Sequence, residues 1–494
     1  MGLYQRVKMP MTSARSARPQ RWTARLLLAW ALLAPSPAWP ADAAIQRLYV
    51  EPLTASAQME KIRSEVIAEI HKLSPVALVS SAAGADAILG GGGEIWIKGY
   101  RSLNPRSGRL PSDGTPIYGG YLSVELRNPQ GGTFWSYLVT PESGSEDVAR
   151  DLARRISRHV ADALAHGQPP PRTPASQQPE TVLHGAGATL PYPVYQKWFT
   201  NYCRENPGLS ITYDPVGSEA GIRRLLDGEL DFGASDNPQA VHQLAPGREV
   251  AYLLFPSVIG AVVPIVNLPG LSGDLSFTPE ALAGIYLGKI RKWNDPVLKQ
   301  INRGLPLPDL DIVVVHRADG SGTSYAWTDF LSATVPGWKA QVGDGFAPAW
   351  PVGRAASGNE GVAAMVKELG GSIGYVEFIY ALQRHLNFGK VRNRHGEFVA
   401  ASLESLALAA TQPAIADDFK VSIVNPPAAG AYPISTFTWL VVPGHIADAA
   451  KRDALAAFLH WMLGPGQLQA SALGYLPLPK DLVHREEAAI AAIR

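Results

Sequence analysis

Three segments of the chain repeat the order of strand, glycine-rich turn and helix, and this order constrains the fold more than any other feature. The turns occupy residues 185–191, 216–221 and 317–324. Each follows a short apolar run with the character of a strand, and each precedes a helical pattern. Repetition of strand, turn and helix indicates an α/β architecture. We therefore predict that residues 181–494 form an α/β domain.

A proline-rich segment separates this region from the first part of the chain. Residues 166–180 contain five prolines and no large apolar side chain, a composition typical of a semi-rigid, solvated linker. A chain of 494 residues corresponds to roughly three folding units at ~150 residues each. Residues 44–165 are predicted to form one of these units, a small α+β accessory domain.

The first 43 residues have the pattern of an export signal. Basic residues without an acidic one precede the apolar run 26–34, and Ala41-Asp42-Ala43 is a small-x-small cleavage site. The apolar run is shorter than the ~20 residues that a membrane-spanning helix needs. We expect cleavage near Ala43 and a mature protein that begins near Ala44, exported and soluble.

The accessory domain shows strand and helix patterns without a catalytic constellation. Apolar residues recur every three or four positions between Met59 and Leu73, and alternate between Leu122 and Leu126, as in a helix and a strand. Glycines 90–93 are expected to form a turn between strands. The order of elements and the segment 85–90 resemble the periplasmic domains of outer-membrane assembly and secretion proteins. This resemblance implies a docking role with an envelope protein partner.

Charge and cysteine content exclude several classes of function. The formal net charge is +1, so the broad basic surface of a nucleic-acid-binding protein is not expected. The single cysteine, Cys203, excludes an intramolecular disulfide framework and a cysteine-based metal centre. We predict no metal, no cofactor and no nucleic-acid partner.

The three turns themselves point to anion binding. A helix that begins directly after a strand leaves unpaired backbone N–H groups at its positive dipole end, and such ends bind anions. Glycine allows close approach, Ser and Thr add hydroxyl donors, and Arg317 enters the third turn. Rival motifs fail on spacing: the sequence has no G-x-G-x-x-G dinucleotide fingerprint, P-loop, nucleophile elbow or H-E-x-x-H metal motif at these turns.

Several motifs resemble the periplasmic phosphate-binding protein of the Pst-type ABC transporter. They occur in the family's order and span nearly all of residues 181–494. The matched segments are residues 185–189, 231–236, 288–295, 317–323, 374–377 and 433–435.

This resemblance implies a two-lobed periplasmic-binding-protein fold that closes around one inorganic phosphate. One lobe would comprise about 181–257 and 431–494, and the other about 258–430. By motif match Asp319 would orient Arg317, and eight residues would contact phosphate. These eight are Thr189, Leu190, Ser218, Asp236, Arg317, Ser321, Gly322 and Thr323. The implied partners are phosphate and the inner-membrane ABC permease subunits, and the implied location is the periplasm.

The chemistry of two residues agrees with these roles. Arg317 offers a fixed charge and a planar fork suited to an oxyanion. Asp236 would be repelled by an anion unless that anion carries a proton, as hydrogen phosphate does and sulfate at neutral pH does not. Sites built to bond a ligand group can reject an analogue lacking it by ~10⁴–10⁵. Two positions depart from the family: Leu190 replaces a common Phe, and Glu219 would weaken anion binding if it pointed into the cleft.

Three functions remain open from the sequence. The leading hypothesis is a non-enzymatic receptor that captures phosphate and delivers it to an ABC importer. The alternative is a phosphate-responsive scaffold or sensor that uses the accessory domain for protein docking. Hydrolysis of phosphate esters is disfavoured because no nucleophile–base pair or metal cluster accompanies the anion site.

Overall fold

The computed structural model describes residues 45–53, 57–101, 115–129, 131–141, 147–166, 181–247, 251–271, 273–411 and 415–494. The predicted signal and nearly all of the predicted linker therefore lie outside the described residues. Within those residues, none of the helices combines the length and the apolar character needed to cross a membrane.

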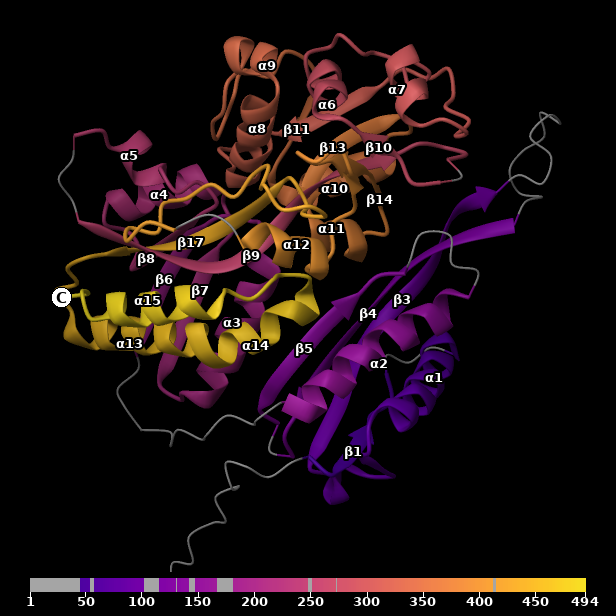
Figure 1. Cartoon of the computed structure of the whole chain (residues 1–494). Coiled ribbons are helices and arrows are strands. Elements are labelled where there is room, and N and C mark those ends of the chain that lie inside the picture. Colours follow the sequence, from indigo (N-terminus) through magenta and orange to yellow (C-terminus); the bar gives the residue numbers. More distant parts are fainter. Residues whose placement is uncertain are drawn as a thin grey trace, which may run out of the picture. The chain divides into compact units, whose positions relative to one another are not determined.

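The described residues between 45 and 166, termed the first domain here, contain a five-stranded sheet with two helices, in the strand order β2-β1-β3-β4-β5. Its helices α1 and α2 lie against each other (Figure 1). The apolar positions predicted for α1 from Met59 to Ile70 are buried in a core that α2 and the sheet share, whereas Leu73, predicted for the same face, is 47% exposed. The elements are β1 (Arg47–Val50), α1 (Ala57–Leu73), β2 (Ala77–Val79), η1 (Ala82–Gly84), β3 (Ala87–Arg101), β4 (Thr115–Arg127), β5 (Thr133–Val139) and α2 (Val148–His166).

The expected turn at glycines 90–93 is wrong. These residues lie inside β3 and pair with β4 from Glu125 to Leu122. A side chain at Gly91 would place its Cβ 2.2 Å from the carbonyl oxygen of Ser123, so the missing side chain lets the two strands approach. Glycine here serves close backbone contact rather than chain reversal.

Residues 181–494 are built on one long mixed sheet with the order β12-β11-β13-β9-β17-β8-β6-β7, and β14 pairs with β9 beside this path. A separate three-stranded sheet has the order β10-β15-β16. The strands are β6 (Thr181–Gly187), β7 (Leu209–Asp214), β8 (Phe232–Ser235), β9 (Tyr252–Asn267), β10 (Ser276–Phe277), β11 (Val313–Arg317), β12 (Arg354–Ala356), β13 (Ser372–Glu377), β14 (Asn387–Phe388), β15 (Lys390–Arg392), β16 (Phe398–Val399) and β17 (Ser435–Pro443).

Helices alternate with these strands, so the α/β prediction is confirmed. The helices are α3 (Tyr192–Glu205), α4 (Ser218–Leu226), α5 (Ala240–Leu244), α6 (Pro279–Tyr286), α7 (Pro296–Ile301), α8 (Gly322–Thr334), α9 (Pro336–Gln341), α10 (Gly358–Glu368), α11 (Phe378–Gln383), α12 (Leu403–Ala410), α13 (Ala449–Trp461), η3 (Met462–Gly466), α14 (Gln467–Ala470), η4 (Ser471–Leu473) and α15 (Lys480–Ile490).

The long strand β9 joins the two halves of this sheet. Its first part pairs with β17 as far as Ala261, and its second part pairs with β13 from Val262 onward. β9 and β17 run side by side as long antiparallel strands (Figure 1). We call the β17-β8-β6-β7 side the first lobe and the β13-β11-β12 side the second lobe. The predicted anion-binding residues lie at the ends of β6, β7, β8 and β11 or in the loops that follow them.

Candidate functional site

The turn after β6 is held in place by two tyrosines. Tyr380 donates to the carbonyl oxygen of Thr189 at 2.8 Å, and Tyr475 donates to that of Leu190 at 2.6 Å. Both predicted ligand residues are almost fully buried. These bonds fix the backbone of the turn. The Thr189 hydroxyl lies at the site, where it accepts from the side-chain amide of Asn359 at 2.8 Å.

Ser218 opens α4 and contacts the start of α8 in the other lobe. Its side chain is fully buried, and its Oγ accepts from the backbone N–H of Gly322 at 3.1 Å. A second bond between lobes joins the N–H of Glu219 to the carbonyl oxygen of Gly320 at 3.0 Å. The lobes therefore touch each other directly at the site.

Glu219 does not direct its charge into this network. Its Oε1 accepts from Arg223, one helical turn later in α4, at 2.7 Å. Its side chain also lies against Gly320. The carboxylate of Glu219 is therefore paired with Arg223 of its own helix, while its Oε2 lies beside the third turn.

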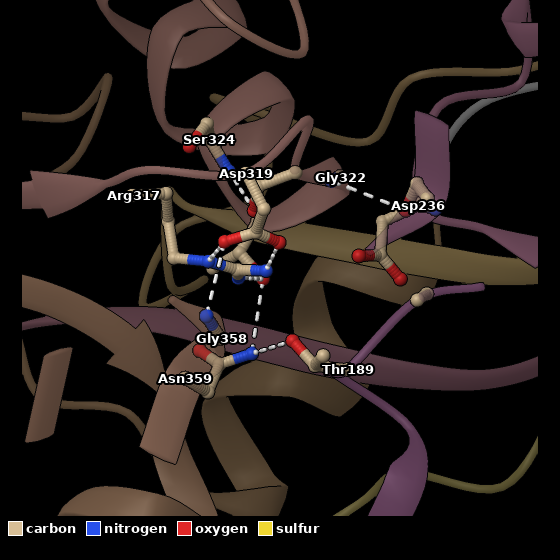
Figure 2. A network of polar contacts seen from close by, with 12 residues as sticks. Thr189, Asp236, Arg317, Asp319, Gly322, Ser324, Gly358 and Asn359 are labelled. Atoms are coloured by element: carbon tan, nitrogen blue, oxygen red, sulfur yellow. Dashed lines mark hydrogen bonds and ion pairs between the residues drawn. The ribbon is translucent and has the colours of Figure 1, made fainter. Parts of the chain in front are cut away.

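Asp236 follows β8 and faces the first residue of α8 (Figure 2). It is 1% exposed, its Oδ1 accepts from the hydroxyl of Thr438, and its Oδ2 is buried without a hydrogen-bond partner. Burial raises the pKa of this carboxyl to about 7, against the opposing effects of Thr438 and Arg317. A Cβ at Gly322 would lie 2.4 Å from Oδ2, so glycine is required there. Asp236 thus places one open acceptor at the start of α8.

Arg317 ends β11 and forms a two-pronged ion pair with Asp319. Its Nε donates to Oδ1 of Asp319 at 2.8 Å, and its Nη2 contacts Oδ2. Burial works to raise the pKa of Asp319, but Arg317 outweighs it and the net pKa is lowered. Asp319 also accepts from the N–H of Gly358 at 3.0 Å. The expectation that Asp319 orients Arg317 agrees with this geometry.

Residues 321–323 begin α8. The Oγ of Ser321 accepts from the N–H of Ser324 at 3.1 Å, which is an N-cap bond, while its own N–H donates to the carbonyl oxygen of Phe346. Thr323 is 1% exposed, and its Oγ1 accepts from Nη1 of Arg317 at 3.4 Å. The structure therefore gathers the predicted residues of all three turns, with Asp236, around one position.

Sequence reasoning missed Asn359 and Thr438. Asn359 bridges Thr189 and Thr323 through its side-chain amide (Figure 2). A usable signal was present, because Ser357-Gly358-Asn359 follows β12 and opens α10, a fourth case of strand, glycine and helix. Thr438 lies inside a buried strand and carries no comparable signal.

The arrangement can bind a small tetrahedral anion that carries a proton. Arg317 supplies charge, hydroxyls and helix starts supply donors, and Asp236 supplies an acceptor. Among the described residues, His, Cys, Asp and Glu side chains form no group suited to holding a metal ion.

Comparison with known proteins gives a consistent picture. The model of the PBP superfamily domain matches residues 173–465. The phosphate-binding protein PstS of Pasteurella multocida (strain Pm70) is 40% identical over 314 residues, which cover 63% of this chain and 90% of that protein. PstS of Xylella fastidiosa (strain Temecula1) is 41% identical, covering 64% of this chain and 86% of that protein.

A solved structure supports the fold. It is a high-affinity periplasmic phosphate-binding protein, PfluDING, bound with phosphate. It matches with a TM-score of 0.50 and 23% identity, over 62% of this chain and 93% of that one. The two-lobed fold predicted from the sequence is confirmed.

Proposed function

Because the chain belongs to the PBP superfamily, and within it to the family of PstS phosphate-binding proteins, we propose that it captures inorganic phosphate in the periplasm and delivers it to an ABC-type importer. The observation that carries this proposal is the buried, unpartnered Oδ2 of Asp236 beside the start of α8, among several hydrogen-bond donors. An acceptor in such a place is useful only for an anion that brings a proton.

Phosphate would be held from both lobes by the eight contact residues predicted from the sequence. Arg317, fixed by Asp319, would bind one phosphate oxygen, and the starts of α4 and α8 would donate to others. Oδ2 of Asp236 would accept a hydrogen bond from the protonated oxygen of hydrogen phosphate. These assignments are supported by the way the residues converge, and by the interlobe bond between Ser218 and Gly322. That bond also explains how closure would shield the anion from water.

Calorimetric titration with phosphate and with sulfate tests this function. We expect tight phosphate binding and much weaker sulfate binding. Arg317→Ala should remove most phosphate binding, since it deletes the site's fixed charge and leaves Asp319 unpaired. Arg452→Ala is a matched control, because Arg452 pairs with Asp453 on the surface of α13. Equal affinities for the two anions in the wild-type protein would contradict the proposal.

The export step rests on the sequence of the first 43 residues. The relatives are named phosphate-binding proteins, and we propose that this chain performs that role in the periplasm. We also propose that the export signal is cleaved near Ala43. Mass determination of the mature protein purified from the cell envelope tests the position. A mass that corresponds to another first residue would place the cleavage site there, and a mass that includes the first 43 residues would contradict cleavage.

We further propose that residues 44–165 form a separate accessory domain joined by a linker at 166–180, and that the lobes divide near 257 and 430. Two separate hydrophobic cores support the division into domains. The switch of β9 from β17 to β13 near Val262 supports the first lobe boundary.

A second candidate function is a phosphate-responsive scaffold, favoured by the accessory domain itself. The relatives match about 63% of this chain but 86–90% of their own length, so the match leaves the accessory domain outside. A pull-down with the full chain tests for an envelope partner. Phosphate uptake by cells that lack residues 44–165 separates the two roles: unchanged uptake would assign the accessory domain a separate task.

The relatives are phosphate-binding proteins, and we propose that this chain likewise binds phosphate without hydrolysing its esters. Incubation of the purified protein with a chromogenic phosphate ester tests this. Turnover that Arg317→Ala abolishes would contradict it.

A further inference from the structure

Asn359 holds a central place in the site although no motif predicted it. It is the second residue of α10, and its side chain is fully buried. Its Oδ1 accepts from the backbone N–H of Glu377 at 2.9 Å. This bond fixes the orientation of the amide, because a carboxamide oxygen accepts and its nitrogen donates. The Nδ2 group must therefore face the opposite way.

The Nδ2 group faces two threonine hydroxyls, one from each lobe. It donates to Oγ1 of Thr189 at 2.8 Å and to Oγ1 of Thr323 at 3.2 Å (Figure 2). Both of its hydrogens are used in these bonds. Thr189 follows β6 in the first lobe, and Thr323 lies in α8 of the second. One amide therefore joins the two lobes across the site.

These bonds set the direction in which each hydroxyl can act. A hydroxyl carries one proton and two lone pairs, so it can either donate or accept toward a ligand. Thr323 Oγ1 already accepts from Asn359 and from Arg317, which occupies both of its lone pairs. Thr189 Oγ1 accepts from Asn359. Within the described residues, neither hydroxyl proton has a protein acceptor, so both protons are free to be donated into the site.

We propose that Asn359 is a positioning residue that fixes the hydroxyls of Thr189 and Thr323 as donors toward the bound anion. The inference rests on the proposed function as a phosphate receptor. It accounts for a site with many donors and one acceptor, Asp236. A hydroxyl that turned its lone pair toward phosphate would lose a bond and add repulsion, and Asn359 prevents this at two places at once. The bond to Thr189 also forms only when the lobes are together, so Asn359 favours closure.

A purely architectural role is the competing explanation. Asn359 could serve only to hold the junction of β13 and α11 through the N–H of Glu377. That role would act through the backbone of Glu377 and would be independent of the threonine hydroxyls. The two explanations therefore differ in whether the effect of Asn359 depends on those hydroxyls.

A double-mutant cycle on the full-length protein separates them. Phosphate dissociation constants are measured for the wild type, Asn359→Ala, the double variant Thr189→Val/Thr323→Val, and the triple variant. Valine keeps the shape of threonine without its hydroxyl. We expect Asn359→Ala to raise the Kd about tenfold or more, since it frees two hydroxyls. In the valine background the same change should raise the Kd by less than about threefold. Equal effects in both backgrounds would overturn the proposal.

A second variant covers the case in which alanine disturbs folding. Asn359→Asp keeps the size of the side chain and the acceptor for Glu377, but it replaces the donor that faces the threonines with an acceptor. We expect Asn359→Asp to lose more phosphate affinity in the wild-type background than in the Thr189→Val/Thr323→Val background, whereas an architectural role or charge repulsion alone predicts the same loss in both. The same loss in both backgrounds would overturn the proposal.

The matched control is Asn267→Asp. The Nδ2 of Asn267 donates to the carbonyl oxygen of Lys367 at the surface of the same lobe. The phosphate Kd of Asn267→Asp should equal that of the wild type. A loss of phosphate affinity as large as that of Asn359→Asp would overturn the proposal. A wild-type protein that binds no phosphate would contradict the proposed function itself. If the wild type binds phosphate and Asn359→Ala has the same phosphate Kd, only the inference about Asn359 is overturned.

Discussion

The carboxyl of Asp236 is the residue whose chemistry most limits what this site accepts. Thr438 donates to Oδ1, so a proton on this carboxyl must reside on Oδ2, the atom that faces Gly322. Burial raises the pKa of Asp236 to about 7. The same oxygen therefore accepts a hydrogen bond in alkaline solution and can donate one in acidic solution.

This change of role predicts that sulfate binding depends on pH. At pH 8 an ionised Asp236 repels sulfate, which has no proton to give, whereas at pH 5 the protonated carboxyl can donate to it. We expect sulfate affinity to rise by about tenfold between pH 8 and pH 5, as the protonated fraction of Asp236 does. Calorimetric titration with sulfate at several pH values measures this change in affinity. A sulfate affinity that does not change with pH would contradict this role.

Asp236→Asn removes the titration while keeping the shape. The asparagine amide does not change its protonation between pH 5 and pH 8, so sulfate affinity should become insensitive to pH over this range. The ratio of phosphate to sulfate affinity should also fall, because the acceptor for the phosphate proton is weakened. Asp448→Asn is the control, since Asp448 caps α13 away from the site. If the ratio in Asp236→Asn stayed at the wild-type value, the acceptor argument would be wrong.

Asp236 also predicts how the stability of the ligand-free protein depends on pH. The pKa is raised in the folded state, so between about pH 4 and pH 7 the folded protein binds more protons than the unfolded chain. The free energy of unfolding should therefore fall as pH rises through this window, by an amount on the order of 4 kcal/mol. Denaturant titrations of wild type and Asp236→Asn measure the difference. An identical pH dependence in both would show that Asp236 does not titrate there.

The sequence could predict the site residues that adjoin turns, but not those that reach the site from elsewhere. Thr189, Ser218 and Arg317 lie at the junction of a strand and a helix, and that junction is visible in the local pattern. Asn359 is 170 residues from Thr189, and Thr438 is 202 residues from Asp236. Contacts over such separations depend on the order of strands in the sheet, which no local pattern contains.

At the scale of elements, the strand–turn–helix order was sufficient to place α3, α4 and α8. The apolar pattern predicted the third of these from about residue 325, yet it begins at Gly322 because Ser321 caps it. Glycines 90–93 show the opposite limit. Their freedom of conformation is visible in the sequence, but whether it serves a turn or a close pair of strands is decided by the neighbouring β4.

The start of α8 predicts a coupled loss of stability and binding for Ser321→Ala. The Oγ of Ser321 accepts from the N–H of Ser324, and loss of such a cap costs about 1 kcal/mol. A frayed first turn would also misplace the N–H groups of Gly322 and Thr323. We expect a lower melting temperature together with a phosphate Kd raised severalfold. Thermal unfolding and titration of the same sample measure both.

Asp448→Ala provides the comparison at a helix outside the site. Asp448 accepts from the N–H groups of Ala450 and Lys451 at the start of α13, so its loss should reduce stability by a similar amount. Phosphate affinity should stay at the wild-type value. If Asp448→Ala weakened binding as much as Ser321→Ala, the effect of Ser321 would reflect stability alone.

For the whole molecule, the two lobes are interleaved in sequence but continuous in structure. β9 belongs to both halves of the sheet, and β17 returns the chain to the first lobe after the second is complete. The length of the chain predicts about three folding units, and we propose that these are the first domain and the two lobes. The interleaving could be expected only from the family resemblance, because it arises from strand order rather than from local patterns.

This continuity predicts that residues 181–494 bind phosphate without the first domain. Every residue of the proposed site lies within this range, and its core includes few residues from the first domain. The two domains do share contacts, since Ser123 and Ser136 donate to the carbonyl oxygens of Ala472 and Leu468. We therefore expect the shortened protein to bind phosphate within about threefold of the full-length Kd while it unfolds at a lower temperature. Titration and thermal unfolding of both proteins measure this. A loss of more than about tenfold in affinity would make the first domain part of the binding unit, because contacts near α14 would then govern how the lobes close.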